Sequence, residues 1–257
     1  MGILTGVGDI PPTHGLLTLT LALLVVTGAA LLGGISGFGF ALISTPLLLA
    51  LGFPLAFVVP TNLMIAMLTR VVVAYRLREH IRYGRVAVMA AASLPGIGLG
   101  LISLALFPAH AIKLATGLLV MVATLLIWRT ASLPPRRPWP GAVAVAGCLG
   151  GLLGVTTSLN GVPPVLLLAS EQTTPKRFQA DLALFFVLTN IATLLLLGWR
   201  GRLPEVATLP LALFWLVIAL IANQVGTSLG GRLSTVVFRR IAMGLAFCAG
   251  IMTVVTA

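Results

Sequence analysis

Small polar residues cluster at two places inside long apolar stretches of this 257-residue chain. Hydroxyl and amide side chains donate hydrogen bonds, and glycine leaves backbone N–H groups accessible, so both clusters could bind an anion. The alternative role of small residues in apolar helices is close helix packing, and for Gly37 and Gly154 both roles are open. We favour binding for the second cluster, which is more polar than packing requires. The candidates are Ser36, Gly37, Phe38, Gly39 and Thr45 in the first cluster, and Thr156, Thr157, Ser158 and Asn160 in the second.

Further polar residues lie on the predicted helices that follow each cluster: Thr61, Asn62, Arg70, Gln179, Asp181 and Asn190. Asn62 and Asn190 lie deep in apolar sequence, so each must hydrogen-bond to a substrate or to another helix. Arg70 could neutralise an anion on the cytoplasmic route, or could extend to the lipid headgroups. Asp181 is the candidate for proton coupling, or it pairs with a nearby basic residue.

The two clusters belong to a repeat with an offset of 117 residues, which aligns Gly33–Pro46 with Gly150–Pro163. Glycine and proline weaken a helix, so the repeat predicts two copies of a broken helix. Helices beginning at Phe38 and near Ser158 would each direct free N–H groups and a positive dipole end at a shared cavity. Paired interruptions of this kind in two halves of a membrane protein indicate a transport site.

An enzymatic function is not supported by the residues. Gly34–Gly37 matches the GxSG motif of rhomboid proteases, but an active serine needs a base. The three histidines lie at segment ends or in loops, so we attribute the match to chance. The chain also lacks a phosphate-binding P-loop. We therefore predict no catalytic residue, no metal site and no cofactor.

The composition is that of a membrane protein, because 59% of the residues are hydrophobic and only 8% are charged. Soluble domains average roughly half apolar and a quarter charged residues. The net charge of +11 comes from basic residues at the ends of apolar segments, as in inner-leaflet anchors. We therefore predict a multi-pass protein of the plasma or inner membrane whose partners are lipid and a small anion. Nucleic acid is excluded, and a homo-oligomer is possible.

The apolar segments predict an all-α fold of two repeats, each with about five helical segments that begin with short broken or re-entrant helices. The first repeat covers residues 1–130, the proline-rich linker 131–140, and the second repeat 141–257. The expected helices cover residues 16–32, 38–51, 55–79, 86–107 and 111–129 in the first half. In the second half they cover residues 142–155, 158–170, 175–199, 205–233 and 237–255.

The distribution of basic residues predicts the orientation of the two halves. If each half has five passes, thirteen of the 16 Lys and Arg residues face the cytoplasm. If the two short segments make one pass, the division is ten to six. The positive-inside rule favours the first arrangement, in which the second repeat is inverted, the linker is cytoplasmic and both termini lie outside. A re-entrant hairpin gives the same sidedness.

The motifs together resemble the TauE/SafE sulfite exporter family. The resemblance rests on Gly33–Gly39 followed by Pro46, on Pro60-Thr61-Asn62, on Pro95–Gly100 and on the repeat from Gly150, and it covers about residues 16–255. It implies a secondary transporter of small sulfur-containing anions such as sulfite, sulfoacetate or other organosulfonates, most often in the direction of export. The second copy lacks the Gly-Phe-Gly of the first and carries Asp181 where the family more usually has a small or hydroxyl residue.

We therefore expect alternating access, in which the two repeats rock around an anion site at the membrane midplane. Two alternatives remain within transport, namely uptake and a different small anion. A third is a non-transporting assembly or sensor subunit, which would tolerate Ala and Val substitutions in Thr156–Asn160.

Overall fold

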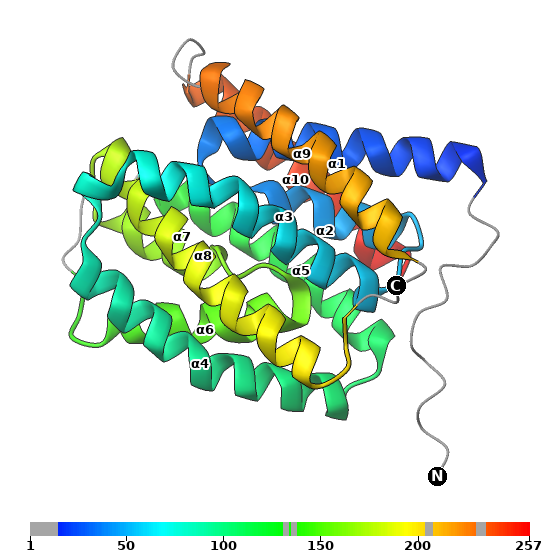
Figure 1. Cartoon of the computed structure of the whole chain (residues 1–257), viewed down its shortest axis with the longest axis horizontal. Helices are drawn as coiled ribbons and strands as arrows, with labels where there is room; N and C mark the ends of the chain where they lie inside the picture. Colours follow the sequence, from blue (N-terminus) through cyan, green and yellow to red (C-terminus); the bar gives the residue numbers. More distant parts are fainter. Residues whose placement is uncertain (1–14, 131–133, 135–137, 204–207, 230–234) are drawn as a thin grey trace.

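The computed structural model describes residues 15–130, 134, 138–203, 208–229 and 235–257, and these residues form a helical bundle (Figure 1). Within them, six helices are long and apolar enough to cross a membrane: α1, α3, α4, α5, α8 and α9. The prediction of an all-α multi-pass membrane protein is confirmed. The lead residues 1–14 and most of the predicted linker lie outside the described residues. The helices are α1 Leu16–Ser36, α2 Phe40–Ala50, α3 Leu55–Arg76, the 3-10 helix η1 Arg78–His80, α4 Tyr83–Leu106, α5 Ala109–Thr130, α6 Ala142–Thr157, α7 Val162–Ser170, α8 Pro175–Trp199, α9 Leu209–Leu229 and α10 Thr235–Val255.

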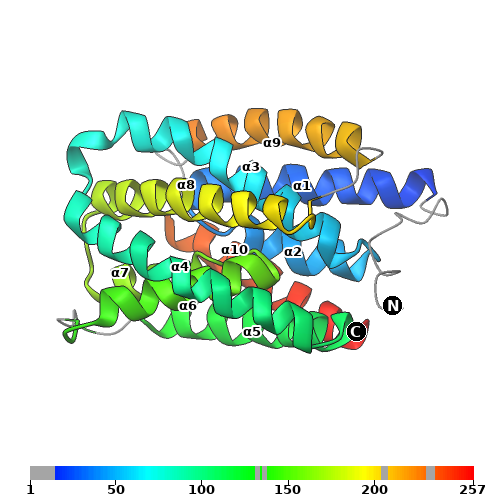
Figure 2. The same ribbon diagram turned by 60° about the horizontal axis from the view of Figure 1, so that its bottom comes forward.

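Consecutive helices reverse direction, so the loops gather at two ends of the bundle, as Figure 1 and Figure 2 show. The start of α1, the C-terminus, the turns after α2 and α4 and the end of α8 lie at one end, which we call the terminus end. The turns after α3 and α7 and the end of α5 lie at the other, which we call the arginine end. By the helix bounds, the basic residues of the arginine end include Arg76, Arg78, Arg82, Arg85, Lys176 and Arg177, whereas Lys113, Arg200 and Arg202 belong to the terminus end. Which end faces the cytoplasm stays a prediction.

The predicted breaks exist, but the helices around them have different bounds. Helix α1 continues through Gly33 and Gly34 to Ser36, four residues beyond the predicted end. Gly37 and Gly39 then adopt φ angles of +79° and +99°, which strongly favour glycine. They turn the chain so that α2 folds back along α1 as a short antiparallel helix, beginning at Phe40 instead of Phe38.

The second break has the same overall form with different residues. Helix α6 ends at Thr157, and Ser158 adopts the left-handed conformation, with φ of +57°. Helix α7 begins at Val162, so the predicted start near Ser158 is wrong by four residues. The reason is that Ser158 terminates α6 in a turn, and its amide bonds back to the carbonyl of Gly154 at 2.9 Å.

Glycines bring equivalent pairs of helices into backbone contact. In α1, a Cβ added to Gly34 would overlap the carbonyl of Asn223 in α9, and one added to Gly151 in α6 would overlap the carbonyl of Ser93 in α4. Gly34 and Gly151 are 117 residues apart, so α6 packs on α4 as α1 packs on α9. Small residues allow such close packing in membranes. The correspondence supports the inverted-repeat arrangement, which remains a prediction.

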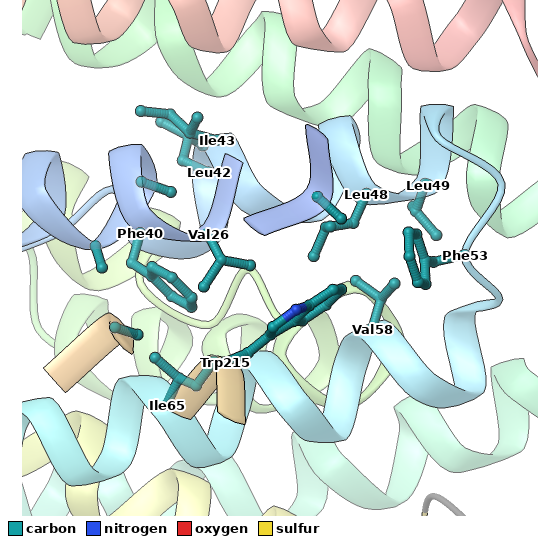
Figure 3. Close-up of a cluster of buried hydrophobic side chains, with 14 of the residues drawn as sticks. Val26, Phe40, Leu42, Ile43, Leu48, Leu49, Phe53, Val58, Ile65 and Trp215 are labelled. Carbon is teal, nitrogen blue, oxygen red and sulfur yellow. The ribbon is translucent and has the colours of Figure 1, made fainter. Parts of the chain in front are cut away.

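A large apolar core holds the α1–α2 hairpin in place (Figure 3). Trp215 of α9 packs edge-on against Phe53, with ring centroids 5.3 Å apart, and Phe40 at the start of α2 is buried in the same cluster. Burial of aromatic side chains supplies much of the packing energy of such a core. Outside this core, α4, α5 and α9 expose rows of large apolar side chains, as expected for a surface that faces lipid.

Candidate anion-binding site between the two helix breaks

The two breaks meet in the interior and enclose a cavity of about 40 Å³, which we call the central cavity. The α1–α2 break contributes Phe38 and Gly39, and the α6–α7 break contributes Ser158 and Asn160. Arg70 of α3 completes the polar lining. A buried water needs about 10–15 Å³ of such volume, so the cavity has room for a few waters or one small ion.

The start of α2 presents backbone donors to this cavity. Residues Phe40, Ala41 and Leu42 line it, and their amides have no acceptor among the described residues. The first amide of α2 to find a backbone acceptor is that of Ile43, which bonds to Gly39 at 3.2 Å. Free N–H groups and the positive end of the helix dipole both favour an anion at this position.

The second break presents fewer free amides: those of Asn160 and Gly161, which line the cavity, have no acceptor among the described residues. At the start of α7 the amides of Val162 and Val165 bond to Leu159 and Gly161, at 3.2 and 2.9 Å. The two residues between them are Pro163 and Pro164, which have no N–H group. The first turn of α7 itself therefore adds no free amide, and the second break contributes the amides of Asn160 and Gly161 together with its side chains.

Ser158 and Asn160 belong to a buried polar layer beside the central cavity. Ser158 Oγ lies 2.7 Å from Thr45 Oγ1, which accepts a hydrogen bond from Asn62 Nδ2 at 3.0 Å. Asn160 Nδ2 donates to Asn190 Oδ1 at 2.6 Å. These bonds join α2 and α3 of the first half to the second break and α8.

Arg70 is the principal charged group of the site. Its side chain is 4% exposed, and its Nη2 donates to the carbonyl of Gly33 at 2.8 Å, so it does not extend to the headgroups. No acidic side chain of the described residues lies within ion-pair distance of it. A buried charge without a counter-ion is costly. The arrangement therefore has a cation, hydroxyls, amides and free N–H groups around a small cavity that can accept an anion.

Other predicted site residues lie away from the central cavity. Ser36 Oγ bonds within the first break, to the carbonyls of Leu32 and Phe38. Gly37 packs against Gln179, which lines a separate cavity at the arginine end. Thr157 bonds to Leu153, and Thr156 lines a cavity at the terminus end. Thr61 is buried next to the polar layer.

Asp181 lies in an ion-pair cluster and not in the central cavity. It is fully buried, and its two oxygens accept hydrogen bonds from the backbone N and the Nε of Arg82, at 2.9 and 2.8 Å. Next to this pair, Arg85 pairs with Glu171 at the end of α7. We call these four residues the arginine-end clamp, because they tie α4 and its preceding loop to α7 and α8.

The alternative that Asp181 pairs with a basic residue is confirmed, but sequence reasoning missed the identity of its partner, the Arg85–Glu171 pair and one polar side chain of the cavity, Thr69. Arg82, Arg85 and Glu171 carried no local motif, since their pairing depends on contacts between distant segments. Thr69 lines both the central cavity and the arginine-end cavity, so the two cavities adjoin at this residue. Its position directly before Arg70 was the only available signal.

Comparison with known proteins identifies the family of the chain. The sequence model of the family described as Sulfite exporter TauE/SafE matches residues 21–253, nearly the whole chain. The chain belongs to this family. No curated protein and no solved structure matches it. A TauE/SafE protein is a membrane transporter, which agrees with the six long apolar helices and the buried polar site of this member.

Proposed function

We propose that the protein is a secondary transporter that exports small sulfur-containing anions, such as sulfite, sulfoacetate or other organosulfonates, across the plasma or inner membrane. The observation that carries the proposal is the buried cation of Arg70, which has no acidic partner in the described residues and lines the central cavity. An anion there would receive the guanidinium charge, the free amides of α2 and the hydroxyl and amide groups of the second break.

In alternating access, the two halves would move relative to each other and expose the central cavity to one side of the membrane at a time. The bonds that link α2 and α3 to the second break are few and polar, so they can exchange with bonds to a substrate at modest net cost. The glycine contacts of α1 with α9 and of α6 with α4 join each first helix to the opposite half. In this scheme the repeats are inverted, the arginine end is cytoplasmic and both termini lie outside.

Flux in proteoliposomes tests the proposal. Sulfite, sulfoacetate and a larger organosulfonate are loaded separately, and their movement is followed with and without a pH gradient. The unmodified protein should move at least one of them, and Arg70→Gln should reduce its rate by at least tenfold, since the charged partner of the anion is lost.

Arg78→Gln is the matched control, because Arg78 is exposed at the arginine end and stacks on Tyr75, 4.7 Å from the ring centroid. It should transport at the normal rate. The proposal is wrong if none of the anions moves or binds, or if Arg70→Gln transports as well as Arg78→Gln.

A further inference from the structure

A larger cavity of about 390 Å³ opens at the terminus end, between α3, α4, α5, α6 and α8. We call it the outer cavity. It extends from the turn before α3 and the end of α8 at its mouth to α3 and α6 at its inner end. The lining residues that matter to the argument are Ala56, Pro60, Thr156, Arg200 and Arg202.

The mouth of the outer cavity carries two positive charges that have no partner among the described residues. Arg200 and Arg202 are exposed, and neither side chain has a hydrogen-bond or ion-pair partner in the described part of the chain. No acidic residue lines the cavity within that part. Basic residues are less frequent on the outer face of membrane proteins than on the cytoplasmic face. Two arginines on the predicted outer face therefore suggest a functional role.

The third basic residue of the terminus end has a structural role. Lys113 Nζ donates to the carbonyl of Thr256 at 2.6 Å and thereby ties α5 to the C-terminus. It does not line the outer cavity, whereas both arginines do. Within the part of the chain that the structure describes, the two basic side chains of this end that have no partner are therefore the two that line the cavity.

The inner end of the outer cavity adjoins the polar layer. Pro60 and Thr156 line the cavity. Asn62 follows Pro60 by two residues and Ser158 follows Thr156 by two residues, and both side chains bond to Thr45. On the same helices, three buried polar atoms have no hydrogen-bond partner among the described residues: Ser44 Oγ, Thr61 Oγ1 and Asn62 Oδ1. Buried polar groups are normally hydrogen-bonded, so these atoms fit a layer that exchanges partners when an anion passes.

We propose that the outer cavity is an anion-binding vestibule, in which Arg200 and Arg202 attract small oxyanions and concentrate them outside the polar layer. The role of the vestibule in transport rests on the proposed function: an anion that leaves the central cavity would bind next in the vestibule. Two positive charges at the mouth of a low-dielectric cleft raise the local anion concentration by tenfold or more.

A cysteine probe measures this potential without any transport. Ala56→Cys is made in a background with Cys148→Ala and Cys248→Ala, and intact cells are treated with an anionic and a cationic methanethiosulfonate of similar size. Ala56 is exposed and lines the cavity. The ratio of the anionic to the cationic labelling rate should fall about tenfold in Arg200→Gln/Arg202→Gln. It should stay unchanged in Arg200→Lys/Arg202→Lys, which keeps both charges.

Lys113→Gln is the matched control, since it removes a basic residue of the same end that does not line the cavity, and its ratio should equal that of the parent. If the double Gln variant does not reach the membrane, the parent is labelled at low and high salt, where screening should lower the ratio. The vestibule is overturned if the ratio is unchanged in the double Gln variant or falls equally in Lys113→Gln. It is also overturned if Ala56→Cys is labelled only from the cytoplasmic side. A falling ratio without anion flux in proteoliposomes overturns the proposed function and leaves the vestibule standing.

Discussion

Asp181→Asn should destabilise the protein strongly, because it breaks the buried half of the arginine-end clamp. The carboxylate is fully buried and holds the Nε and Nη2 atoms of Arg82 at 2.8 and 2.7 Å. Asparagine can keep the bond from the Arg82 backbone N–H but removes the charge. Removing one partner of a buried pair costs about 3–5 kcal/mol.

The lower part of that range applies here. The Arg82 side chain is 30% exposed, so water partly stabilises its charge after the partner is lost. We expect a loss of about 3 kcal/mol, which corresponds to a fall of about 6–12 °C in the thermal midpoint of a protein of this size. Purified protein in detergent is heated while tryptophan fluorescence is followed.

A double-mutant cycle separates the ion pair from other effects of the substitution. Arg82→Gln alone should cost at least as much as Asp181→Asn, because it leaves the fully buried Asp181 carboxylate without its cation. The double variant should cost clearly less than the sum of the two single variants. Glu79→Gln is the control, as Glu79 is exposed on η1 and should leave the midpoint unchanged. A coupling energy near zero would refute the clamp.

The same variants test Asp181 as the proton-coupling residue. A structural clamp predicts that Asp181→Asn and Arg82→Gln impair transport in parallel with stability, and that the remaining flux still responds to a pH gradient. A coupling residue predicts that Asp181→Asn alone loses the response to the gradient.

Two further substitutions test the packing and the polar layer. Gly151→Ala should lower the thermal midpoint by several degrees, since the added Cβ overlaps the carbonyl of Ser93 and overpacking costs about 1–3 kcal/mol. Gly244→Ala, which meets nothing within 4 Å, should not, and equal midpoints would contradict the tight α4–α6 contact. Thr45→Val should cost about 1–3 kcal/mol by leaving buried polar partners unsatisfied, whereas Thr45→Ser should keep the bonds and the midpoint.

The fold was largely predictable because apolar length and helix-breaking residues act locally. Helix α8 has the bounds expected from the sequence, Pro175–Trp199, since a proline begins it and its apolar run ends near a pair of arginines. The end of α1 was predicted too early because glycine was treated as a breaker. In the structure Gly34 stays helical, and the close contact with α9 compensates for its weak propensity.

The site was predictable in its parts but not in its assembly. Arg70 stood out by its depth in an apolar segment, and the structure places it at the central cavity. The partners of Asp181 and Asn160 come from residues 99 and 30 positions away. One sequence contains no signal for such pairings, because the same donor could bond with any buried acceptor.

The unequal breaks have a consequence for how an anion is bound. A symmetric pair of helix starts would attract an anion equally from both sides. In this chain the first half supplies the guanidinium of Arg70 and the free amides of α2. The second break supplies the free amides of Asn160 and Gly161 but no charged side chain to the cavity lining, and its Ser158 and Asn160 side chains already bond within the polar layer. The anion should therefore bind mainly to the first half, and release of the layer bonds should govern its passage toward the outer cavity.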